Sequence, residues 1–566
     1  MDGNVVPMKI IVSNLTMAND TVSQLEASFE ALQLAPANGP YQDPIKLEEG
    51  FDLFPHQQEA LQWMKKVEDD RRSNQHGMVG GILNLNMGLG KTLTTLYHTL
   101  NNNNGSYPTL ILAPKAVLDE WYSDIHKFFG DRVKVLILHR DYLKSKFNNV
   151  DREMVVQHDV VLTTYDVCVR ACIKAKHYVS CLEFGEGCQQ NKVVGIHNKS
   201  RRDANHPQYK GANVVYGTPW HRVVCDESQR FTNHESAVFK SVMAIYGKYR
   251  WCLSGTPIRN SELDIWTQLR FCGYKTITKA IEWRREGLKT YTTNNLKQYV
   301  FRTTKDDVNH LNIPIKVEHD IMVGLSSDHS KVYQDMLLKT KQAYIKMLGS
   351  SSESFSCVLA LFTKLRQCAI SMDLVKVPDE SSAVVDDYGT SNKFMEVLKI
   401  IDNIQSNGPD KVIIFSMFSS ALRLLGTELE RNHIQYELVC GSNNGCDREA
   451  TFQRFKEDPN INVLLMTYRV GAEGLNLTEA NHCICLEPWW NNAVHEQAKA
   501  RVWRMGQTKK VDVYNLYMEN SIEEKIKEVC MVKDDISSSF LNGTRRTLKK
   551  QSLNKEMLGR LLGIWE

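Results

Sequence analysis

Residues 80–92 read GGILNLNMGLGKT, an apolar run that ends in a glycine-rich turn and then lysine and threonine. Such a turn exposes backbone N–H groups to phosphate oxygens, and here it consists of Met87, Gly88, Leu89 and Gly90. Lys91 can reach the β- and γ-phosphates of a nucleotide, and the Thr92 hydroxyl can ligate Mg²⁺. The stretch therefore predicts a phosphate-binding loop.

An acidic pair, Asp226-Glu227, ends a second apolar run further along the chain. Asp226 can hold a metal ion with its water shell, and Glu227 can orient the attacking water. Each motif alone has a simpler explanation, because a GxGKT turn can be a flexible surface loop and an acidic strand end can merely be solvated. Together, in this order, they predict an enzyme driven by a nucleoside triphosphate.

The composition is that of an ordinary globular protein, with 42% hydrophobic and 24% charged residues among 566. This length predicts two or three domains. The net charge of +3 means that any contact with nucleic acid comes from local patches. We see no secretory signal and no apolar run of membrane-spanning length. The fourteen cysteines contain no C-x-x-C pair, which favours reduced thiols inside a cell.

One group of cysteines and histidines lies between the two nucleotide motifs, within residues 168–206. Its spacings fit no compact zinc pattern, so incidental thiols are the favoured interpretation and zinc binding is the alternative. The group consists of Cys168, Cys172, His177, Cys181, Cys188, His197 and His206.

Two series of short apolar runs, separated by helix-length segments, predict two parallel sheets that are covered on both faces. The first series is 109–113, 159–164, 222–227 and 250–254, and the second is 411–416, 462–467, 482–487 and 511–518. Ligands of such sheets bind at the carboxyl ends of the strands, where Lys91, Asp226 and Ser254 fall. We predict an extension (1–48), a first lobe (49–310), helical insertions with a linker (311–390), a second lobe (391–540) and a tail with a closing helix (541–566).

The motifs of the first lobe resemble, in order, those of the SNF2-type branch of superfamily 2 helicase-like ATPases. Residues 54–57 (FPHQ) resemble the adenine-reading Q motif, and 80–92 resemble motif I. The motifs that follow are similar to 110–121 (LILAPKAVLDEW), 163–165 (TTY), 226–229 (DESQ) and 253–260 (LSGTPIRN).

The second lobe continues the resemblance, which covers about residues 50–566. Motifs IV, V and VI are similar to 412–416, 471–478 (GAEGLNLT) and 497–507 (QAKARVWRMGQ), followed by 520–524. The closing segment 553–564 resembles that of the transcription-terminator and Rad5-like subgroup. The resemblance implies an α/β fold of two RecA-like lobes, with ATP and Mg²⁺ as cofactors.

The same resemblance implies roles for further residues. Gln57 and Gln497 would contact ATP, and Arg501 and Arg504 would stabilise charge on the γ-phosphate. The two arginines are one helical turn apart, so both can face one cleft, although a plain basic helix face is the alternative. Ser254 and Thr256 would sense the γ-phosphate, unless their segment is a plain turn.

Family members track duplex DNA along its phosphates, which implies contacts without base reading. The residues expected to make them are Lys115, Thr163, Thr164, Asn476 and Thr478. Trp489-Trp490 is either a stacking wedge or, as we favour, buried core. The basic stretch 545–550 either binds phosphate or keeps the tail solvated.

The chain departs from the family pattern at several positions. Leu85-Asn86 stands where an acidic pair is usual, Ala472 where glycine is common, and Ala500 where an acidic residue is usual. The RING finger of many Rad5-like members is absent, since residues 310–410 hold only Cys357 and Cys368. This compact form resembles viral members of the family as much as cellular ones.

The resulting expectation is a DNA-dependent ATPase that translocates on duplex DNA and displaces DNA-bound proteins or acts on transcription machinery. We expect a monomer on DNA, no membrane contact, and a location in the nucleus or a viral replication compartment. Two alternatives stay open: a helicase that separates strands of DNA or RNA, and an inactive scaffold in a transcription complex.

Overall fold

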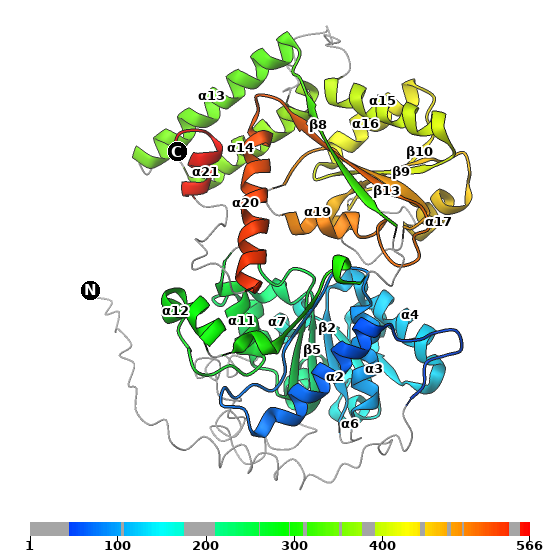
Figure 1. The fold of residues 1–566 in the computed structure, drawn as a ribbon, viewed down its shortest axis with the longest axis vertical. Helices are drawn as coiled ribbons and strands as arrows, with labels where there is room; N and C mark the ends of the chain where they lie inside the picture. The colour runs from blue at the N-terminus through cyan, green and yellow to red at the C-terminus, as the bar shows by residue number, and fades with distance from the viewer. Residues whose placement is uncertain are drawn as a thin grey trace.

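The computed structural model shows two α/β lobes stacked along the long axis of the molecule (Figure 1). It describes most of the chain from residue 45 onward. The described ranges are 45–103, 107–174, 210–259, 261–293, 295–308, 314–349, 354–375, 391–441, 448–471, 477–489, 492–542 and 555–565.

The first lobe is built on a sheet of seven parallel strands in the order β3-β4-β2-β5-β6-β1-β7. The strands are β1 (Ile82–Leu85), β2 (Thr109–Ala113), β3 (Val135–Ile137), β4 (Val160–Thr164), β5 (Trp220–Asp226), β6 (Gly247–Leu253) and β7 (Val300–Thr303). The inner strand β2 is buried along its whole length, which requires helices on both of its faces. Each apolar run of the first predicted series coincides with one of these strands.

The helices of the first lobe form two groups. One contains α2 (Pro55–Asp69), α3 (Lys91–Asn101) and α4 (Leu118–Phe129), which contact one another in sequence order. The other contains α7 (Tyr165–Lys174), α10 (Ala237–Met243), α11 (Leu263–Phe271) and α12 (Ala280–Thr293). The shorter helices are α5 (Arg140–Leu143), α6 (Arg152–Val156) and α9 (Val214–Gly217).

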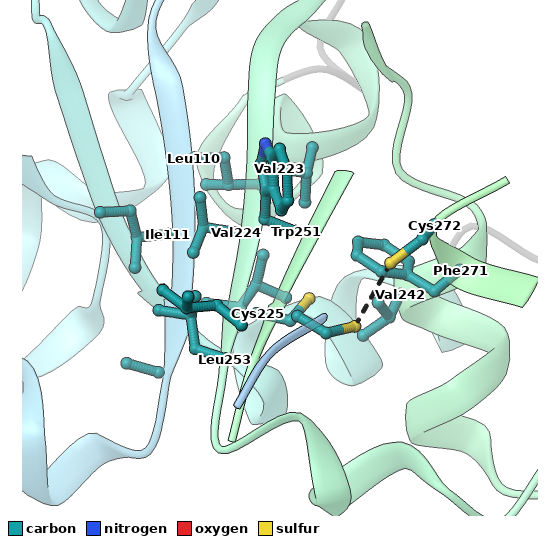
Figure 2. Packing of buried hydrophobic residues seen from close by; sticks show 14 of the residues in the cluster. Leu110, Ile111, Val223, Val224, Cys225, Val242, Trp251, Leu253, Phe271 and Cys272 are labelled. Atoms are coloured by element: carbon teal, nitrogen blue, oxygen red, sulfur yellow. Dashed lines mark hydrogen bonds between the residues drawn. The ribbon is translucent and has the colours of Figure 1, made fainter. Parts of the chain in front are cut away.

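The core of the first lobe lies between the sheet and these helices. Figure 2 shows Ile111 of β2, Val224 of β5 and Trp251 of β6 packed side by side, all with no exposed surface. Two thiols of this core, Cys252 and Cys272, lie 3.8 Å apart. Because strands this deeply buried cannot shift without opening the core, the loops at their carboxyl ends are held in fixed positions.

The second lobe is built on a sheet of six parallel strands in the order β10-β11-β9-β12-β13-β8. The strands are β8 (Lys316–Val323), β9 (Lys411–Ser416), β10 (Tyr436–Val439), β11 (Val463–Thr467), β12 (Ala480–Cys485) and β13 (Val511–Met518). Two parallel sheets with covering helices confirm the predicted fold class. Strand β8 is a difference, because it pairs with β13 along its full length although we had placed residues 311–390 outside the second lobe.

The helices of the second lobe fall into a covering set and a projecting set. The covering set is α15 (Asn392–Asn407), α16 (Ser419–Arg431), α17 (Arg448–Glu457), α18 (Tyr468–Gly471) and α19 (Asn492–Lys499). The projecting set is α13 (Ser327–Gly349), α14 (Phe355–Ile370) and α21 (Lys555–Leu561). The closing helix α21 docks on α13, where the Tyr344 hydroxyl donates to the carbonyl of Lys555 at 2.8 Å.

Helix α20 (Ile522–Asn542) connects the two lobes (Figure 1). Its first turns place Ile522 and Ile526 in the hydrophobic cluster of α13 and α14. Its last turns place Phe540 and Leu541 in the core of the first lobe, with the ring of Phe540 5.3 Å from that of Tyr291. One helix therefore shares both hydrophobic cores.

Candidate nucleotide site between the lobes

A cavity of about 660 Å³ lies at the carboxyl end of β1 and is lined by both lobes. The first lobe supplies the loop before α3, the start of α2, one face of α4 and the end of β5. The second lobe supplies residues 500, 501 and 504–506. The cavity brings together Gln57, Met87, Gly88, Gly90, Lys91, Thr92, Asp226, Glu227, Arg501 and Arg504.

The predicted phosphate loop is a tight turn between β1 and α3. Gly88 and Gly90 have φ angles of +85° and +78°, a region that side chains with a Cβ rarely adopt. Helix α3 begins at Lys91, so its first backbone N–H groups point toward the cavity and favour an anion there. The Lys91 ammonium donates to the carbonyl of Leu85 at 3.0 Å, which folds its side chain back over the turn.

Two residues at the start of α2 support the phosphate loop from behind. The amide of the buried Gln57 side chain lies 3.4 Å from the carbonyl of Gly90, and its oxygen accepts from the Phe54 N–H at 2.9 Å. The ring of His56 lies 3.0 Å from the carbonyl of Leu89. In this structure Gln57 lines the cavity and also braces the loop, while Leu89 is fully buried beneath it.

The carboxylate of Asp226 is held from two sides. The indole N–H of Trp121 donates to one oxygen at 2.9 Å, and the backbone N–H of Glu227 donates to the other at 2.9 Å. Burial and then the charge of Glu227 raise the pKa of Asp226 to about 7, although Trp121 and Lys91 act in the opposite direction. Asp226 is thus fixed in position and faces the side chain of the phosphate-loop lysine.

Glu227 has a left-handed backbone, with φ 49° and ψ 48°. A residue with a Cβ costs about 1–3 kcal/mol in such a conformation, and this cost persists only where the surroundings impose it. The Glu227 carboxylate accepts hydrogen bonds from the amides of Gln229 and Gln497, the latter at 3.2 Å. Gln229 in turn accepts from the Ser254 hydroxyl at 2.7 Å. A chain of polar contacts therefore runs from Ser254 through Glu227 to the second lobe.

Arg501 and Arg504 both line the cavity, but not for the reason given by the sequence. Helix α19 ends at Lys499, so the two arginines lie in the turns that follow and not on one helix face. The guanidinium of Arg501 donates to the carbonyl of Gly471 at 3.0 Å. The argument from helical spacing is wrong, while the expected convergence on one cleft holds.

Charges of both signs line the cavity, and burial makes them costly. Burial lowers the pKa of Lys91 and that of Arg501, while Asp226, Glu227 and Glu120 oppose the shift. Burial also raises the pKa of Glu120 and brings that of Asp124 to about 6. Lys91 and Arg501 thus offer partly desolvated positive charge to a bound polyanion, such as a triphosphate.

The residues proposed for Mg²⁺ offer the type of ligand that this ion prefers. Thr92 and Asp226 line one cavity and present a hydroxyl and a carboxylate, and Mg²⁺ in nucleotide sites combines few protein oxygens with phosphate oxygens and water. Within the described ranges no three His, Cys, Asp or Glu side chains converge as a metal site. The donor set therefore fits an ion shared with a nucleotide.

The residues predicted to contact DNA differ in their exposure to solvent. Thr163 is fully buried, and its hydroxyl donates to the carbonyl of Leu138 at 2.8 Å, so this side chain is not presented to a phosphate. Thr164 is also buried and accepts from the Val167 N–H at 3.3 Å. Lys115 is exposed in an ion pair with Asp141. Thr478 is half-buried, and Asn476 lies outside the described residues.

Other predicted features are only partly visible. Cys168 and Cys172 are buried free thiols of α7, and the remaining members of their predicted group lie outside the described ranges. The same is true of Trp490 and the basic stretch 545–550. Trp489 is half-buried, and the guanidinium of Arg366 lies 4.4 Å from its ring centre.

The structure adds residues that we had not assigned to the site. Trp121 holds Asp226, Gln229 links Ser254 to Glu227, and Lys305 approaches the arginine segment from the first lobe. Trp121 and Gln229 lie inside motifs quoted above, so the signal was present. The sequence did not show which residues these side chains contact. For Trp121 that residue, Asp226, is far away in the sequence.

Comparison with known proteins identifies the family of this chain. Residues 56–374 match the model of the SNF2-related domain, and residues 392–506 match that of the helicase conserved C-terminal domain. The chain belongs to the SNF2 family. It is accordingly a DNA-dependent ATPase of the helicase-like class, and ATP is its substrate.

Two viral relatives resemble this SNF2 protein over nearly their whole length. The putative helicase 172L of invertebrate iridescent virus 6 is 42% identical over 92% of this chain and 96% of its own. The probable global transactivator of Orgyia pseudotsugata multicapsid polyhedrosis virus is 28% identical over 91% and 95%. The predicted resemblance to compact viral members is confirmed.

Among solved structures, the Sulfolobus solfataricus SWI2/SNF2 ATPase core in complex with dsDNA is 23% identical, with a TM-score of 0.37. The match covers 92% of this chain and 98% of the Sulfolobus chain. In the part of this chain that the structure describes, no helix is both long and apolar enough to cross a membrane.

Proposed function

We propose that this protein is an ATP-driven translocase on double-stranded DNA that displaces or remodels proteins bound there. The observation that carries the proposal is the hydrogen bond from Gln497 to Glu227, because it ties a residue of the second lobe to the proposed catalytic carboxylate of the first. Hydrolysis that depends on both lobes can be coupled to their relative movement, as a motor requires.

The proposed chemistry assigns one task to each group. Lys91 and the N-terminus of α3 bind the β- and γ-phosphates, and Glu227 orients the attacking water. Arg501 and Arg504 neutralise the charge that grows on the γ-phosphate. Bound by Thr92 and Asp226, Mg²⁺ would supply further positive charge to the phosphate oxygens.

For DNA we propose Lys115, Thr478 and Asn476 as phosphate contacts. Lys115 is paired with Asp141, and both side chains are more than half exposed, so a phosphate can replace the carboxylate at small cost. Thr163 and Thr164 contribute only by supporting the carboxyl end of β4 and the start of α7. Contacts of this kind position DNA without reading its sequence.

The deciding experiment measures ATP hydrolysis by the full chain without nucleic acid and with duplex DNA, single strands and RNA. We expect duplex DNA to stimulate most, independently of sequence and less strongly as salt rises. A triplex-forming strand on a duplex track should be displaced with ATP, while a forked duplex should stay paired.

Other outcomes of this experiment favour other functions. Strong unwinding of the fork, or preferential stimulation by RNA, would identify a strand-separating helicase. An absence of hydrolysis under every condition would identify a scaffold.

For the biological setting we propose transcription of viral or chromatin-associated DNA, in the nucleus or a viral replication compartment. Support comes from the relative described as a probable global transactivator. More distant relatives are named for DNA excision repair and chromatin remodelling: ERCC-6 of Mus musculus and ISW2 of Saccharomyces cerevisiae, at 25% and 26% identity. We expect the protein to act as a monomer on DNA.

A further inference from the structure

Trp503 lies between the two arginines of the second lobe in the sequence and contacts the residues at the start of β8. Its indole N–H donates to the carbonyl of Pro314 at 2.7 Å. The Lys316 ammonium, at the start of β8, lies 4.9 Å from the ring centre. Trp503 is therefore anchored to the chain that leaves the first lobe, although it belongs to the second.

Lys305 contacts Trp503 from the side of the first lobe. It lies two residues after the end of β7 and opens a short 3₁₀ turn, Lys305–Asp307. Its ammonium lies 3.7 Å from the centre of the Trp503 ring and also donates to the Trp503 carbonyl. A cation that lies against an aromatic ring and bonds to the adjacent carbonyl fixes both the side chain and the backbone of its partner.

The backbone held in this way leads directly into Arg504. A methyl group placed on Gly88 of the phosphate loop would lie 2.9 Å from the Arg504 Cβ and 3.9 Å from the Lys305 Cε. The phosphate loop, the arginine and the lysine thus meet at one point. A shift of the Trp503 backbone would move the start of the Arg504 side chain relative to the nucleotide.

We propose that Lys305 is a positioning residue for ATP hydrolysis, which places Arg504 over the phosphate loop by holding the ring and carbonyl of Trp503. The proposal rests on the proposed role of Arg504 at the γ-phosphate. Lys305 itself need not contact the nucleotide. Because the arginine matters most in the transition state, loss of Lys305 lowers kcat and leaves the binding of ATP nearly unchanged.

Because of the surroundings of Lys305, the proposal predicts a specific pH dependence of activity. Burial lowers the pKa of Lys305 to about 7, and the charges of Lys316, Arg504 and Lys91 act in the same direction, against Glu496. Below pH 7 the ammonium is present and holds Trp503. Above it a neutral amine remains, and its contacts with the ring and the carbonyl are weaker. In the free enzyme the contribution of Lys305, and with it part of kcat/KM, is therefore lost as pH rises through about 7.

The test compares Lys305→Met, Lys305→Arg and wild type by kcat and KM for ATP between pH 6 and 9, with saturating duplex DNA. For Lys305→Met we expect kcat to fall about tenfold or more at pH 6.5, with KM within about twofold, since an arginine finger is worth about 10³–10⁵ when wholly absent. Lys305→Arg should restore kcat and, because a guanidinium stays charged, abolish the decline of kcat/KM above pH 7. Lys279→Met, an exposed lysine of the same lobe, is the matched control.

Each further result decides the question. Wild-type kcat in Lys305→Met, while Lys91→Ala is inactive, would overturn this inference and leave the proposed nucleotide site intact. Activity in Lys91→Ala would overturn both. If Lys305→Met does not fold, Lys305→Arg decides: a pH profile identical to that of wild type contradicts the positioning role, and loss of the alkaline decline supports it.

Discussion

The side-chain amide of Gln497 donates to the carboxylate of Glu227 at 3.2 Å, across the boundary between the lobes. Glu227 has a left-handed backbone conformation, and the side chain of Gln497 is buried. Both partners are therefore held in place, unlike two mobile side chains on a surface. The contact connects the proposed catalytic base to the helix that precedes the arginines. The relative placement of the lobes thereby becomes part of the catalytic geometry.

The first prediction concerns this contact. Gln497→Ala should lower kcat for ATP by about tenfold, equivalent to about 1.4 kcal/mol, because Glu227 loses one of the donors that orient it. Gln497→Glu should be more damaging, since it places a second carboxylate against the first. Steady-state kinetics with Gln453→Ala, an exposed glutamine of α17, as the control measure the effect. A wild-type rate in both Gln497 variants would show that Glu227 needs no partner in the second lobe.

The second prediction concerns the groups at the phosphates. Lys91→Ala should bind ATP weakly and nearly abolish turnover, because the β- and γ-phosphates lose their main cation. Glu227→Gln should bind ATP normally and lose hydrolysis, since an amide cannot orient and deprotonate water in the same way. Nucleotide titration beside single-turnover kinetics separates the two effects. Wild-type hydrolysis by Lys91→Ala would refute the assignment of the site.

The third prediction concerns the two arginines. Arg501→Ala and Arg504→Ala should each reduce kcat by orders of magnitude, about 10³-fold by analogy with other arginine fingers, with little change in ATP affinity. Lysine substitutions should restore only part of the rate, because a point charge does not reproduce the planar fork. If affinity and rate fell equally, the arginines would instead be residues that bind the ground state.

The fourth prediction concerns stability. Glu68 is buried beneath the first sheet and accepts hydrogen bonds from Arg222 and the Trp251 indole, and Nε2 of His98 lies 3.0 Å from its carboxylate. Glu68→Gln should destabilise the first lobe by about 3–5 kcal/mol, because it leaves the buried Arg222 without its counter-charge. Chemical unfolding at pH 7 measures the loss, with the exposed Glu59→Gln as the control. Equal stability of the two variants would show that the ion pair contributes nothing net.

The pKa of Glu68 gives this prediction a sign in pH. Burial acts to raise it, but the charges of Arg222 and His98 outweigh burial and lower it well below the ordinary value. A carboxylate with a lowered pKa in the folded state stabilises above its unfolded pKa, about 4.3, and this stability is lost as pH falls. Wild type should therefore lose stability below about pH 4 more steeply than Glu68→Gln.

The sequence was most informative where local pattern and local structure coincide. The run Thr109–Ala113 is a strand with the predicted bounds, because five apolar or β-branched residues in a row fit only a strand that is buried on both faces. The phosphate loop was equally clear, since its glycines are required by positive φ angles at Gly88 and Gly90.

Features that depend on distant partners could not be read in this way. Strand β8 (KVEHDIMV) has three polar residues in a row, 318–320, and is defined by its pairing with β13, almost two hundred residues later. The hydrogen bond from Trp121 to Asp226 likewise joins two residues that are 105 positions apart in the sequence. Spacing suggested a helix under Arg501 and Arg504, whereas the chain turns after Lys499 and reaches the cavity without one.

Helix α20 has a consequence for how force can pass through this protein. The polypeptide crosses from the first lobe to the second after β7, and α20 brings it back into the first core at Phe540 and Leu541. The lobes are thus connected twice, once by the chain after β7 and once by α20, a helix of 21 residues. Two connections permit the lobes to rotate about the axis of α20 and resist their separation. For the proposed translocase, this means that strain exerted on a duplex would not separate the two lobes.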